Sequence, residues 1–547
     1  MNLLLINGFS TPTSVIDEIL SGSASKSYVY LSYPLSVLTL AGWCRKELPD
    51  INIKIIDASM DLHKYMSTKE TTEAGTCLPL TTRRQNFIKS LLNKIDFIPD
   101  VIGVSINFSN GHRSCLELCQ CCKEKWSESK IIVGGVHATT FTHRIIENDY
   151  IDYVLKGVGD ISFINFLQQF IEGNHPNIKT IQGMPMDSLD GIPPYPYDLI
   201  DMEYIIKNES TNPMQGPNTR TGIVLMSRGC PYGCIFCSAD KVHGRKNILK
   251  NIDMVITEIE YLVNNFNINT IGIIDDLFGM NKEYFYDFFD KIKEKKLQLK
   301  FYIPGGLSIN VFDEKMIDVL IEHGFNAVYF PLESGSAYVQ NKIIKKRVNL
   351  DKAIRLISYA KQKGIFVGIN IILGFPGETI ELMQETYDFV KNLPIDWVSF
   401  FSAYPYPETE MTNILLGNGS ITEDELINMW DTSTQGFNER CFDTKEISSK
   451  DLSTLIYDFN IELNFFNNYN IRTKNFHKMI PKLNRVIQRY PFHVVALACR
   501  SKCYHHMGHK EQSLKDIFTI NELINNNEES INMFRRYKQR IESEFLC

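Results

Sequence analysis

The stretch RGCPYGCIFCSAD, residues 228–240, contains three closely spaced cysteines: Cys230, Cys234 and Cys237. Gly229, Pro231 and Gly233 alternate with them, and glycine and proline favour a loop over a helix. Such a loop wraps around an inorganic core more readily than it fills a hydrophobic core. Three thiolates hold three corners of a four-iron, four-sulfur cluster and leave the fourth iron open to a small-molecule ligand. We therefore expect a 4Fe–4S cluster at these cysteines.

A zinc site is the alternative for the same loop. Structural zinc needs four protein ligands, and His243 is the only local candidate for the fourth position. Its distance from the last cysteine does not match the spacing of a zinc finger. The pattern therefore favours the cluster over zinc.

Composition limits the class of protein. The chain has 547 residues, which corresponds to about three or four domains at roughly 150 residues each. Its 44% hydrophobic and 22% charged residues are typical of a soluble globular protein, and a net charge of -7 argues against a broad nucleic-acid-binding surface. No secretory leader and no membrane-spanning apolar run is apparent. We expect a cytoplasmic protein, in which the thirteen cysteines are ligands, core residues or reactive groups and not disulfides.

Residues 1–190 alternate short apolar runs with helical segments. The runs are 2–8, 52–58, 100–107, 130–136 and 153–160. This alternation predicts an α/β domain with a doubly wound parallel sheet buried on both faces. Such sheets bind ligands at the carboxyl ends of their strands, where this sequence has Ser105, Gly134, Gly135 and Gly157. The glycines allow the backbone to approach a ligand closely.

Residues 191–410 follow a proline-rich joining segment and alternate in the same way. Six strands are predicted, at 221–227, 270–276, 300–307, 327–334, 366–374 and 397–405. A complete parallel barrel needs eight strand–helix units, so six units predict a partial (β/α)6 barrel.

Residues 411–547 contain no convincing strand and predict an all-α domain. Helices are expected at 450–466, 474–490, 492–508, 511–524 and 531–545. The turn at Gly508 and the spacing of the helix pairs are compatible with tetratricopeptide-like repeats, and equally with an ordinary helical cap.

The motif CPYGCIFC resembles the cysteine motif of the radical S-adenosylmethionine (SAM) enzymes. Four further segments resemble the branch of that family with an amino-terminal cobalamin-binding domain: 273–278, 329–336, 374–379 and 404–410. In the first region the segments 33–42, 101–107 and 131–139 resemble the cobalamin-type domain itself. The resemblance covers about residues 1–410 and implies three cofactors: a 4Fe–4S cluster, S-adenosylmethionine and cobalamin.

The resemblance also implies roles for individual residues around SAM. Phe236 is expected beside the adenine, and Asp275 or Asp276 at the amino group, although capping of a helix is the alternative for these two carboxylates. Glu333 and Ser334 are expected near the ribose. Lys345 or Lys346 is expected at the carboxylate, or else on a solvated face, and Gly374 lets the backbone approach the adenosyl part. An electron donor such as flavodoxin or ferredoxin is implied.

The sequence gives less direct evidence for cobalamin than for the 4Fe–4S cluster. The chain lacks the Asp-x-His-x-x-Gly motif that ligates cobalt, and His137 occupies a loop position of the cobalamin-type domain by resemblance. Gly157-Val158-Gly159-Asp160 stands where the branch usually has Gly-Glu-Gly-Glu. With cobalamin, the implied reaction is methylation of an unactivated carbon on a small-molecule or peptide substrate. Without it, radical coupling, cyclisation or rearrangement with a vestigial first domain is the alternative, and a non-catalytic iron–sulfur scaffold is a third.

Two other groups of chemistry-bearing residues have simpler interpretations. Cys115, Cys119 and Cys122 have helical spacing, so they are expected to pack as small hydrophobic residues and not to hold an auxiliary cluster. A second group comprises Cys499, Cys503, His506 and His509. Packing and solvent exposure at a helix–turn–helix junction are favoured there over zinc binding.

Overall fold

The computed structural model describes residues 1–22, 29–68, 78–212, 218–432 and 440–545. The chain divides into two compact units. The first unit comprises Met1–Gly305, Glu322–Gly324 and Tyr404–Phe442, and the second unit comprises Gly306–Ile321, Phe325–Ala403 and Asp443–Cys547. This division into two units does not test the domain boundaries predicted near residues 190 and 410, which remain predictions.

The first unit is built on a parallel sheet whose strand order is β2-β1-β3-β4-β5-β6. Its strands are β1 (Asn2–Asn7), β2 (Asn52–Asp57), β3 (Val101–Ser105), β4 (Lys130–Gly134), β5 (Tyr153–Lys156) and β6 (Thr180–Gln182). The five predicted strands are confirmed, and β6 is an addition at the edge. All pairings are parallel, so the carboxyl ends of the strands meet along one edge.

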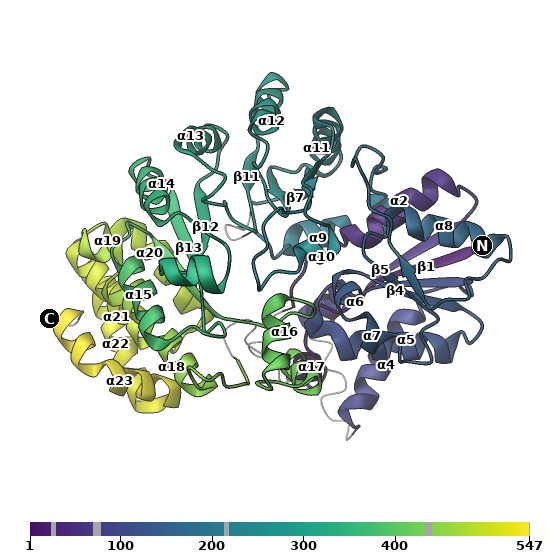
Figure 1. Cartoon of the computed structure of the whole chain (residues 1–547). Helices are drawn as coiled ribbons and strands as arrows, with labels where there is room; N and C mark the ends of the chain where they lie inside the picture. The colour runs from purple at the N-terminus through teal and green to yellow at the C-terminus, as the bar shows by residue number, and fades with distance from the viewer. Residues whose placement is uncertain (23–28, 69–77, 213–217, 433–439, 546–547) are drawn as a thin grey trace. The chain divides into compact units, whose positions relative to one another are not determined.

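Helices cover both faces of this sheet, as Figure 1 shows for α2 and α8 on one face and α4, α5 and α7 on the other. The helices are α1 (Thr13–Leu20), α2 (Leu35–Glu47), α3 (Ala58–Thr68), α4 (Leu80–Leu92), α5 (His112–Lys125), α6 (Val136–Thr140), α7 (Thr142–Ile145), α8 (Asp160–Ile171) and α9 (Met202–Asn208). Two separate hydrophobic clusters result, one under α2 and α8 and one under α1, α4 and α5. The doubly wound prediction is therefore confirmed.

The remainder of the first unit contains a three-stranded parallel sheet of order β11-β10-β7 and a small antiparallel pair. The strands are β7 (Thr221–Val224), β10 (Thr270–Ile273) and β11 (Lys300–Tyr302), and the pair is β8 (Ser227–Arg228) with β9 (Ile248–Leu249). The helices are α10 (Ala239–Val242), α11 (Ile252–Phe266), α12 (Lys282–Glu294), α16 (Glu410–Gly417) and α17 (Glu423–Thr432). The strand predicted over 221–227 ends at Val224, because the chain turns there to pair β8 with β9.

The second unit contains a parallel sheet of order β12-β13-β14. Its strands are β12 (Ala327–Glu333), β13 (Phe366–Leu373) and β14 (Trp397–Ser402), and the accompanying helices are α13 (Glu314–Glu322), α14 (Leu350–Gln362) and α15 (Ile380–Lys391). All six strands predicted for the partial barrel are thus present, as two three-stranded parallel sheets.

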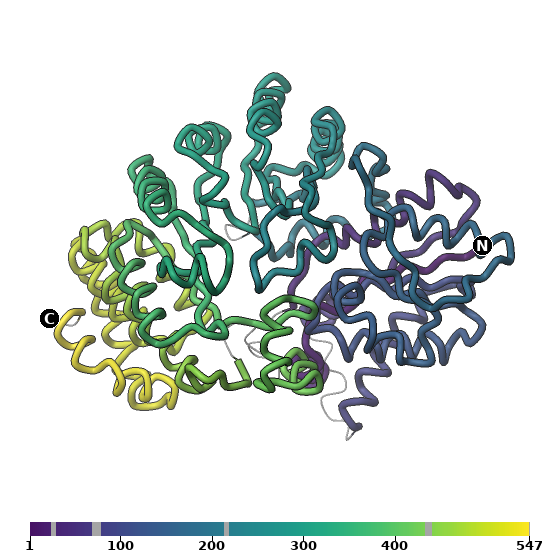
Figure 2. The backbone as a smooth tube through the Cα atoms, in the orientation of Figure 1, coloured from purple at the N-terminus to yellow at the C-terminus, as the bar shows by residue number. Residues whose placement is uncertain are grey.

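The carboxyl-terminal part of the second unit is helical over the described residues 443–545, as predicted. Its helices are α18 (Ser449–Ile461), α19 (Tyr469–Arg472), α20 (Phe476–Arg489), α21 (Val494–His506), α22 (Lys510–Asn526) and α23 (Glu528–Glu544), with a π-helical segment at Glu462–Phe466. Figure 2 shows these helices stacked on one another, with α21 packed against α20, α22 and α23. The tetratricopeptide-like interpretation remains a prediction. None of the helices in the described ranges has the length and apolar content needed to cross a bilayer.

Candidate functional site

The three predicted cluster ligands lie in one loop of the first unit, between β8 and β9. Gly229 begins the loop with a φ of +92°, and an added Cβ would lie 2.1 Å from the carbonyl oxygen of Lys246, so only glycine fits. The amide of Cys230 donates to the carbonyl of Gly244 at 3.3 Å, and the amide of Cys237 donates to the carbonyl of Cys234 at 3.2 Å. Backbone hydrogen bonds within the loop therefore hold the segment that carries the cysteines in a closed conformation.

Asp275 fixes the entry to the cysteine loop. It follows β10, and its carboxylate accepts from the amide of Met226 at 2.7 Å and from the hydroxyl of Ser227 at 2.8 Å. Burial raises the pKa of Asp275 to about 7, although these donors oppose the shift. The carboxylate therefore supports β8 from the end of β10 and does not cap a helix.

Asp276 fixes the loop itself. Its carboxylate accepts from the amide of Gly229 at 2.7 Å and from Nδ1 of His243 at 2.7 Å. Burial by itself raises the pKa of Asp276, but His243, the Gly229 amide and the charge of Arg228 outweigh burial and hold the pKa below its ordinary value. His243, the candidate fourth zinc ligand, is thus bound to a carboxylate at the base of the loop.

A helix supports the loop beside its last cysteine. The amide of Met411, in α16, donates to the carbonyl of buried Ile235 at 2.9 Å, and half-buried Phe236 follows Ile235. Across the part of the chain that the structure describes, no three His, Cys, Asp or Glu side chains are gathered closely enough to hold a single metal ion.

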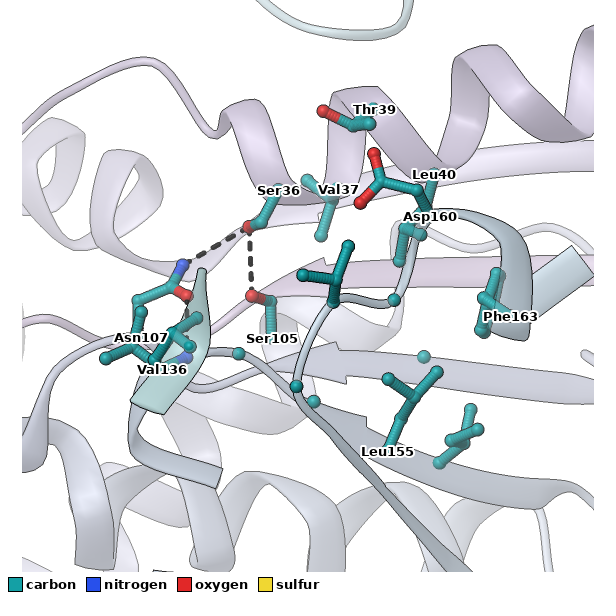
Figure 3. A pocket seen from close by; sticks show the side chains of 18 of the residues that line it. Ser36, Val37, Thr39, Leu40, Ser105, Asn107, Val136, Leu155, Asp160 and Phe163 are labelled. Carbon is teal, nitrogen blue, oxygen red and sulfur yellow. Dashed lines mark hydrogen bonds between the residues drawn. The ribbon is translucent and has the colours of Figure 1, made fainter. Parts of the chain in front are cut away.

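A pocket opens at the carboxyl ends of β3, β4 and β5, where Ser105, Gly134, Gly135 and Gly157 all line it (Figure 3). Its empty space, counted out to open solvent, is about 800 Å³. Apolar side chains form most of the remaining wall: Val37, Leu40, Val104, Ile132, Leu155 and Phe163.

The polar groups of the pocket are linked to one another. The hydroxyls of Ser36 and Ser105 lie 2.9 Å apart, and the side-chain amide of Asn107 donates to Ser36 at 3.2 Å (Figure 3). Gly135 follows with a φ of +100°, and a Cβ there would lie 2.6 Å from the carbonyl oxygen of Ile106. The structure therefore brings four predicted positions together and adds Ser36 and Asn107, which sequence reasoning missed.

His137 lies behind the pocket wall and does not line the pocket. It is 1% exposed, its Nδ1 lies 3.0 Å from the hydroxyl of Ser109, and its Nε2 lies 2.9 Å from Nδ1 of His112. Burial lowers its pKa well below the ordinary value, and His112 adds to the shift. Both ring nitrogens are therefore engaged within the protein.

Val242 and His243 of the cysteine loop also line this pocket, as does Arg228, the last residue of β8. Arg228 pairs with Asp160, the first residue of α8, with 2.9 Å between Nη1 and Oδ2; Asp160 is buried and Arg228 is half-buried. Sequence reasoning recorded Asp160 only as part of an altered motif. The one available signal was its position directly after the strand-end glycines Gly157 and Gly159.

The second unit places the predicted ribose residues at the end of β12. Glu333 has a φ of +68° at an irregularity in the strand pairing, and its carboxylate binds Lys346 at 2.8 Å. The hydroxyl of Ser334 is buried and lies 2.8 Å from that of Thr386. Lys345 is exposed and has a φ of +57°. Of the two adjacent lysines, Lys346 is therefore the one joined to the strand end.

Gly374 lies at the end of β13 in the same unit. It has a φ of +85°, and its amide donates to the carboxylate of Glu378 at 2.7 Å, as does the amide of Phe375 at 3.1 Å. Glu378 is fully buried, so its carboxylate shapes the turn that carries Gly374. Sequence reasoning missed Glu378, although it lies within the segment 374–379 that was singled out.

The other cysteine groups are core residues. Cys115, Cys119 and Cys122 are fully buried between α5 and the sheet, and burial raises the pKa of Cys115 to about 12. Cys499 and Cys503 are also fully buried, in α21, where they belong to the helical core of the second unit. The prediction that these thiols pack as small hydrophobic residues is confirmed.

Comparisons with known proteins bear on the cysteine loop directly. The Radical SAM superfamily pattern matches residues 224–390. These residues form a radical SAM domain. The predicted resemblance is therefore confirmed, and the radical SAM domain includes the cysteine loop, Asp275, Asp276, Glu333 and Gly374.

Two curated relatives of this chain are named as methyltransferases. An uncharacterized methyltransferase of Pyrococcus horikoshii is 28% identical over 348 residues, which cover 60% of this chain and 72% of the relative. The cytidylyl-2-hydroxyethylphosphonate methyltransferase of Streptomyces wedmorensis is 27% identical over 373 residues, which cover 61% and 69%. The radical SAM domain and the names of these relatives confirm the prediction of a methyltransferase-like radical SAM enzyme.

Two solved structures share the fold of this chain. The cobalamin-dependent SAM radical enzyme OxsB, solved with aqua-cobalamin, has a TM-score of 0.58 at 15% identity and covers 100% of this chain and 84% of its own. The radical SAM methyltransferase TsrM from Kitasatospora setae, solved with cobalamin and a 4Fe–4S cluster, has a TM-score of 0.54 at 16% identity and covers 76% and 78%. The architecture predicted for the chain is therefore found in known structures.

Proposed function

We propose that this chain is a cobalamin-dependent radical SAM methyltransferase. It cleaves S-adenosylmethionine reductively to a 5'-deoxyadenosyl radical and methylates an unactivated carbon. One observation carries the proposal: a single pocket is lined both by the strand ends of the cobalamin-like sheet and by residues of the cysteine loop. A cofactor in that pocket lies against the loop that holds the cluster. The cobalamin-containing structures with the same fold add support.

The pocket fits the apolar base of a corrinoid's nucleotide tail. An added Cβ at Gly134 would meet no protein atom nearer than 3.8 Å, so the space beside this backbone is open to a ligand. Leu40, Leu155 and Phe163 supply apolar contacts, and Ser105 supplies a hydroxyl. Bound cobalamin supplies the methyl group that the substrate carbon receives. The protein binds and orients it and keeps water away.

Residues of the radical SAM domain hold the other two cofactors in this proposal. Cys230, Cys234 and Cys237 would hold the 4Fe–4S cluster, which would bind SAM and supply the electron for its cleavage. Phe236 lies by the adenine. The hydrogen bonds of Asp275 and Asp276 to the backbone of 226–229 support a further task, which is to keep the cysteine loop in place while SAM binds.

Glu333, Ser334 and Gly374 contact the adenosyl part of SAM in this proposal. Lys345 or Lys346 binds the SAM carboxylate in this proposal; Lys345 is exposed, and Lys346 is paired with Glu333. The substrate is a small molecule or a peptide, and the electrons come from a flavodoxin or ferredoxin.

The test is anaerobic purification of the chain with cobalamin supplied, followed by analysis of cobalt, iron and reaction products. We expect about one cobalt and about four irons per chain, and 5'-deoxyadenosine on reduction with SAM. Cys234→Ala should abolish 5'-deoxyadenosine formation because the cluster loses one of its three ligands. Cys441→Ala, at an exposed cysteine outside the loop, is the matched control and should leave formation unchanged.

Three results separate this function from the alternatives. SAM cleavage that survives Cys234→Ala rejects the cluster assignment. Cleavage without bound cobalt favours corrin-free coupling, cyclisation or rearrangement. One relative, at 23% identity, is a cyclase by name, the anaerobic magnesium-protoporphyrin IX monomethyl ester cyclase of Rubrivivax gelatinosus. A cluster whose spectrum does not respond to SAM indicates a non-catalytic scaffold.

A further inference from the structure

Asp160 has a buried carboxylate in which one oxygen accepts a hydrogen bond from the protein and the other does not. The residue is 5% exposed, and Oδ2 accepts from Arg228 at 2.9 Å. Oδ1 is shielded from solvent and has no hydrogen-bond partner among the described residues. Buried polar atoms are almost always hydrogen-bonded, so an unmatched carboxylate oxygen on a pocket wall indicates a missing donor.

We propose that Asp160 binds the pocket's ligand and couples the pocket to the cysteine loop. Its Oδ1 accepts a hydrogen bond from an N–H or O–H group of the bound molecule, while Oδ2 keeps Arg228 in place. The inference rests on the proposed function, because it takes that molecule to be a corrinoid. Corrinoids carry primary amide arms and a ribose hydroxyl, which are donors of the required kind.

The surroundings of Asp160 make such a hydrogen bond effective. Figure 3 shows its carboxylate beside Leu40 and Thr39, and the hydroxyl of Thr39 already donates to the carbonyl of Leu35 at 2.7 Å. The neighbouring wall is apolar, and a hydrogen bond to a charged oxygen is stronger where water is excluded. An acceptor at this position selects ligands that present a donor and disfavours ligands that present only acceptors or anions.

Arg228 connects the carboxylate to the cluster site. It is the last residue of β8, and the cysteine loop begins at the next residue, Gly229, whose amide is held by Asp276. The negative charge of Asp276 also acts on Arg228. Arg228 is therefore a positioning residue: a ligand that fixes Asp160 fixes Arg228, and with it the start of the loop.

The experiment measures hydroxocobalamin binding and loop order in the full chain, reconstituted with its cluster. Asp160→Asn should weaken the binding of hydroxocobalamin about tenfold by spectrophotometric titration, because the charged acceptor is lost. Hydrogen exchange followed by mass spectrometry should show that hydroxocobalamin slows exchange in residues 229–247 of the wild type. Asp160→Asn should lose this protection even when the ligand is saturating.

Asp57→Asn is the matched control. Asp57 is also a buried carboxylate at the carboxyl end of a strand, and its Oδ2 also has no hydrogen-bond partner within the described part of the chain, but it does not line the pocket. The affinity of this variant for hydroxocobalamin should stay within about twofold of the wild type, because a carboxylate outside the pocket makes no contact with the ligand.

Arg228→Lys tests the coupling separately, in case Asp160→Asn does not fold. The lysine keeps the positive charge beside Asp160 but not the guanidinium geometry, so hydroxocobalamin affinity should be retained while protection of residues 229–247 falls. Equal affinity in Asp160→Asn and the wild type, or unchanged loop protection in Arg228→Lys, overturns the inference and leaves the proposed function standing. A wild-type chain that does not bind hydroxocobalamin overturns both.

Discussion

Two buried histidines behind the pocket wall make the first unit sensitive to acid. Burial, reinforced by the charges of Arg113 and Arg144 and opposed by that of Asp431, lowers the pKa of His112 to about 4. The unfolded chain binds a proton at His112 near pH 6.5 and the folded chain does not, so stability falls as the pH drops from about 6.5 to 4. We expect a loss of about 2 kcal/mol between pH 7 and pH 5 from His112 alone.

The measurement is urea unfolding followed by fluorescence at both pH values. His112→Gln removes the titrating group, so its unfolding free energy should depend less steeply on pH than that of the wild type. A variant with the same pH slope as the wild type would show that His112 does not remain neutral in the folded protein.

Single residues were predictable where their own chemistry restricts them. The cysteines of the loop and the glycines at the strand ends are examples, because few other residues serve in those places. The pair of Asp160 and Arg228 was not predictable, because the two residues are 68 positions apart and neither is unusual in its local sequence. Such partners become visible only when the fold brings their elements together.

The cysteine loop, as an element, depends on one backbone position. Gly229→Ala would place a Cβ 2.1 Å from the carbonyl oxygen of Lys246 and force a residue with a side chain to keep a φ of +92°. We expect this variant to assemble less than a tenth of the wild-type cluster, measured as iron and sulfide bound after anaerobic reconstitution. Gly244→Ala isolates the effect of conformation, since Gly244 has a φ of +78° but no atom within 4 Å of an added Cβ.

The outcome of that comparison is specific. Gly244→Ala should keep most of its iron, because only the cost of a positive φ applies, about 1 kcal/mol. Equal iron content in the two variants would contradict the view that the close approach at Gly229 closes the loop.

Strands were predicted best where they are buried, because a buried strand appears in the sequence as a continuous run of apolar residues. The strands at β3 and β13 are examples, since they are buried along much of their length. The edge strand β6 was missed because Thr180–Gln182 is short and mostly exposed, so it has no apolar signature. The early end of β7 was missed because the carboxylate of Asp275, which follows β10, and not a local turn signal, holds the chain after Val224.

At the scale of the whole molecule, the helices after residue 443 are part of the second unit's fold. The side chain of Asn464, which is fully buried, pairs with the edge strand β14 as another strand would: its Oδ1 accepts from the amide of Val398 at 2.9 Å, and its Nδ2 donates to the Val398 carbonyl at 2.8 Å. Asn468 and Asn470 bind Asp396 just before the same strand. The sequence suggested a separate helical domain, because nothing local marks an asparagine as a partner for a strand.

Asn464→Ala should therefore destabilise the second unit well beyond the loss of one side chain. It leaves the amide and the carbonyl of Val398 buried without partners, at about 1–3 kcal/mol each. We expect a lower midpoint in thermal unfolding and faster proteolysis within residues 397–402. Asn525→Ala, at a side chain on α22 that bonds only within its own helix, should leave both measurements unchanged.

Truncation at residue 443 should yield an insoluble chain, because β14 then loses the helices that cover it. A soluble, folded product would show that the helices are a separable domain.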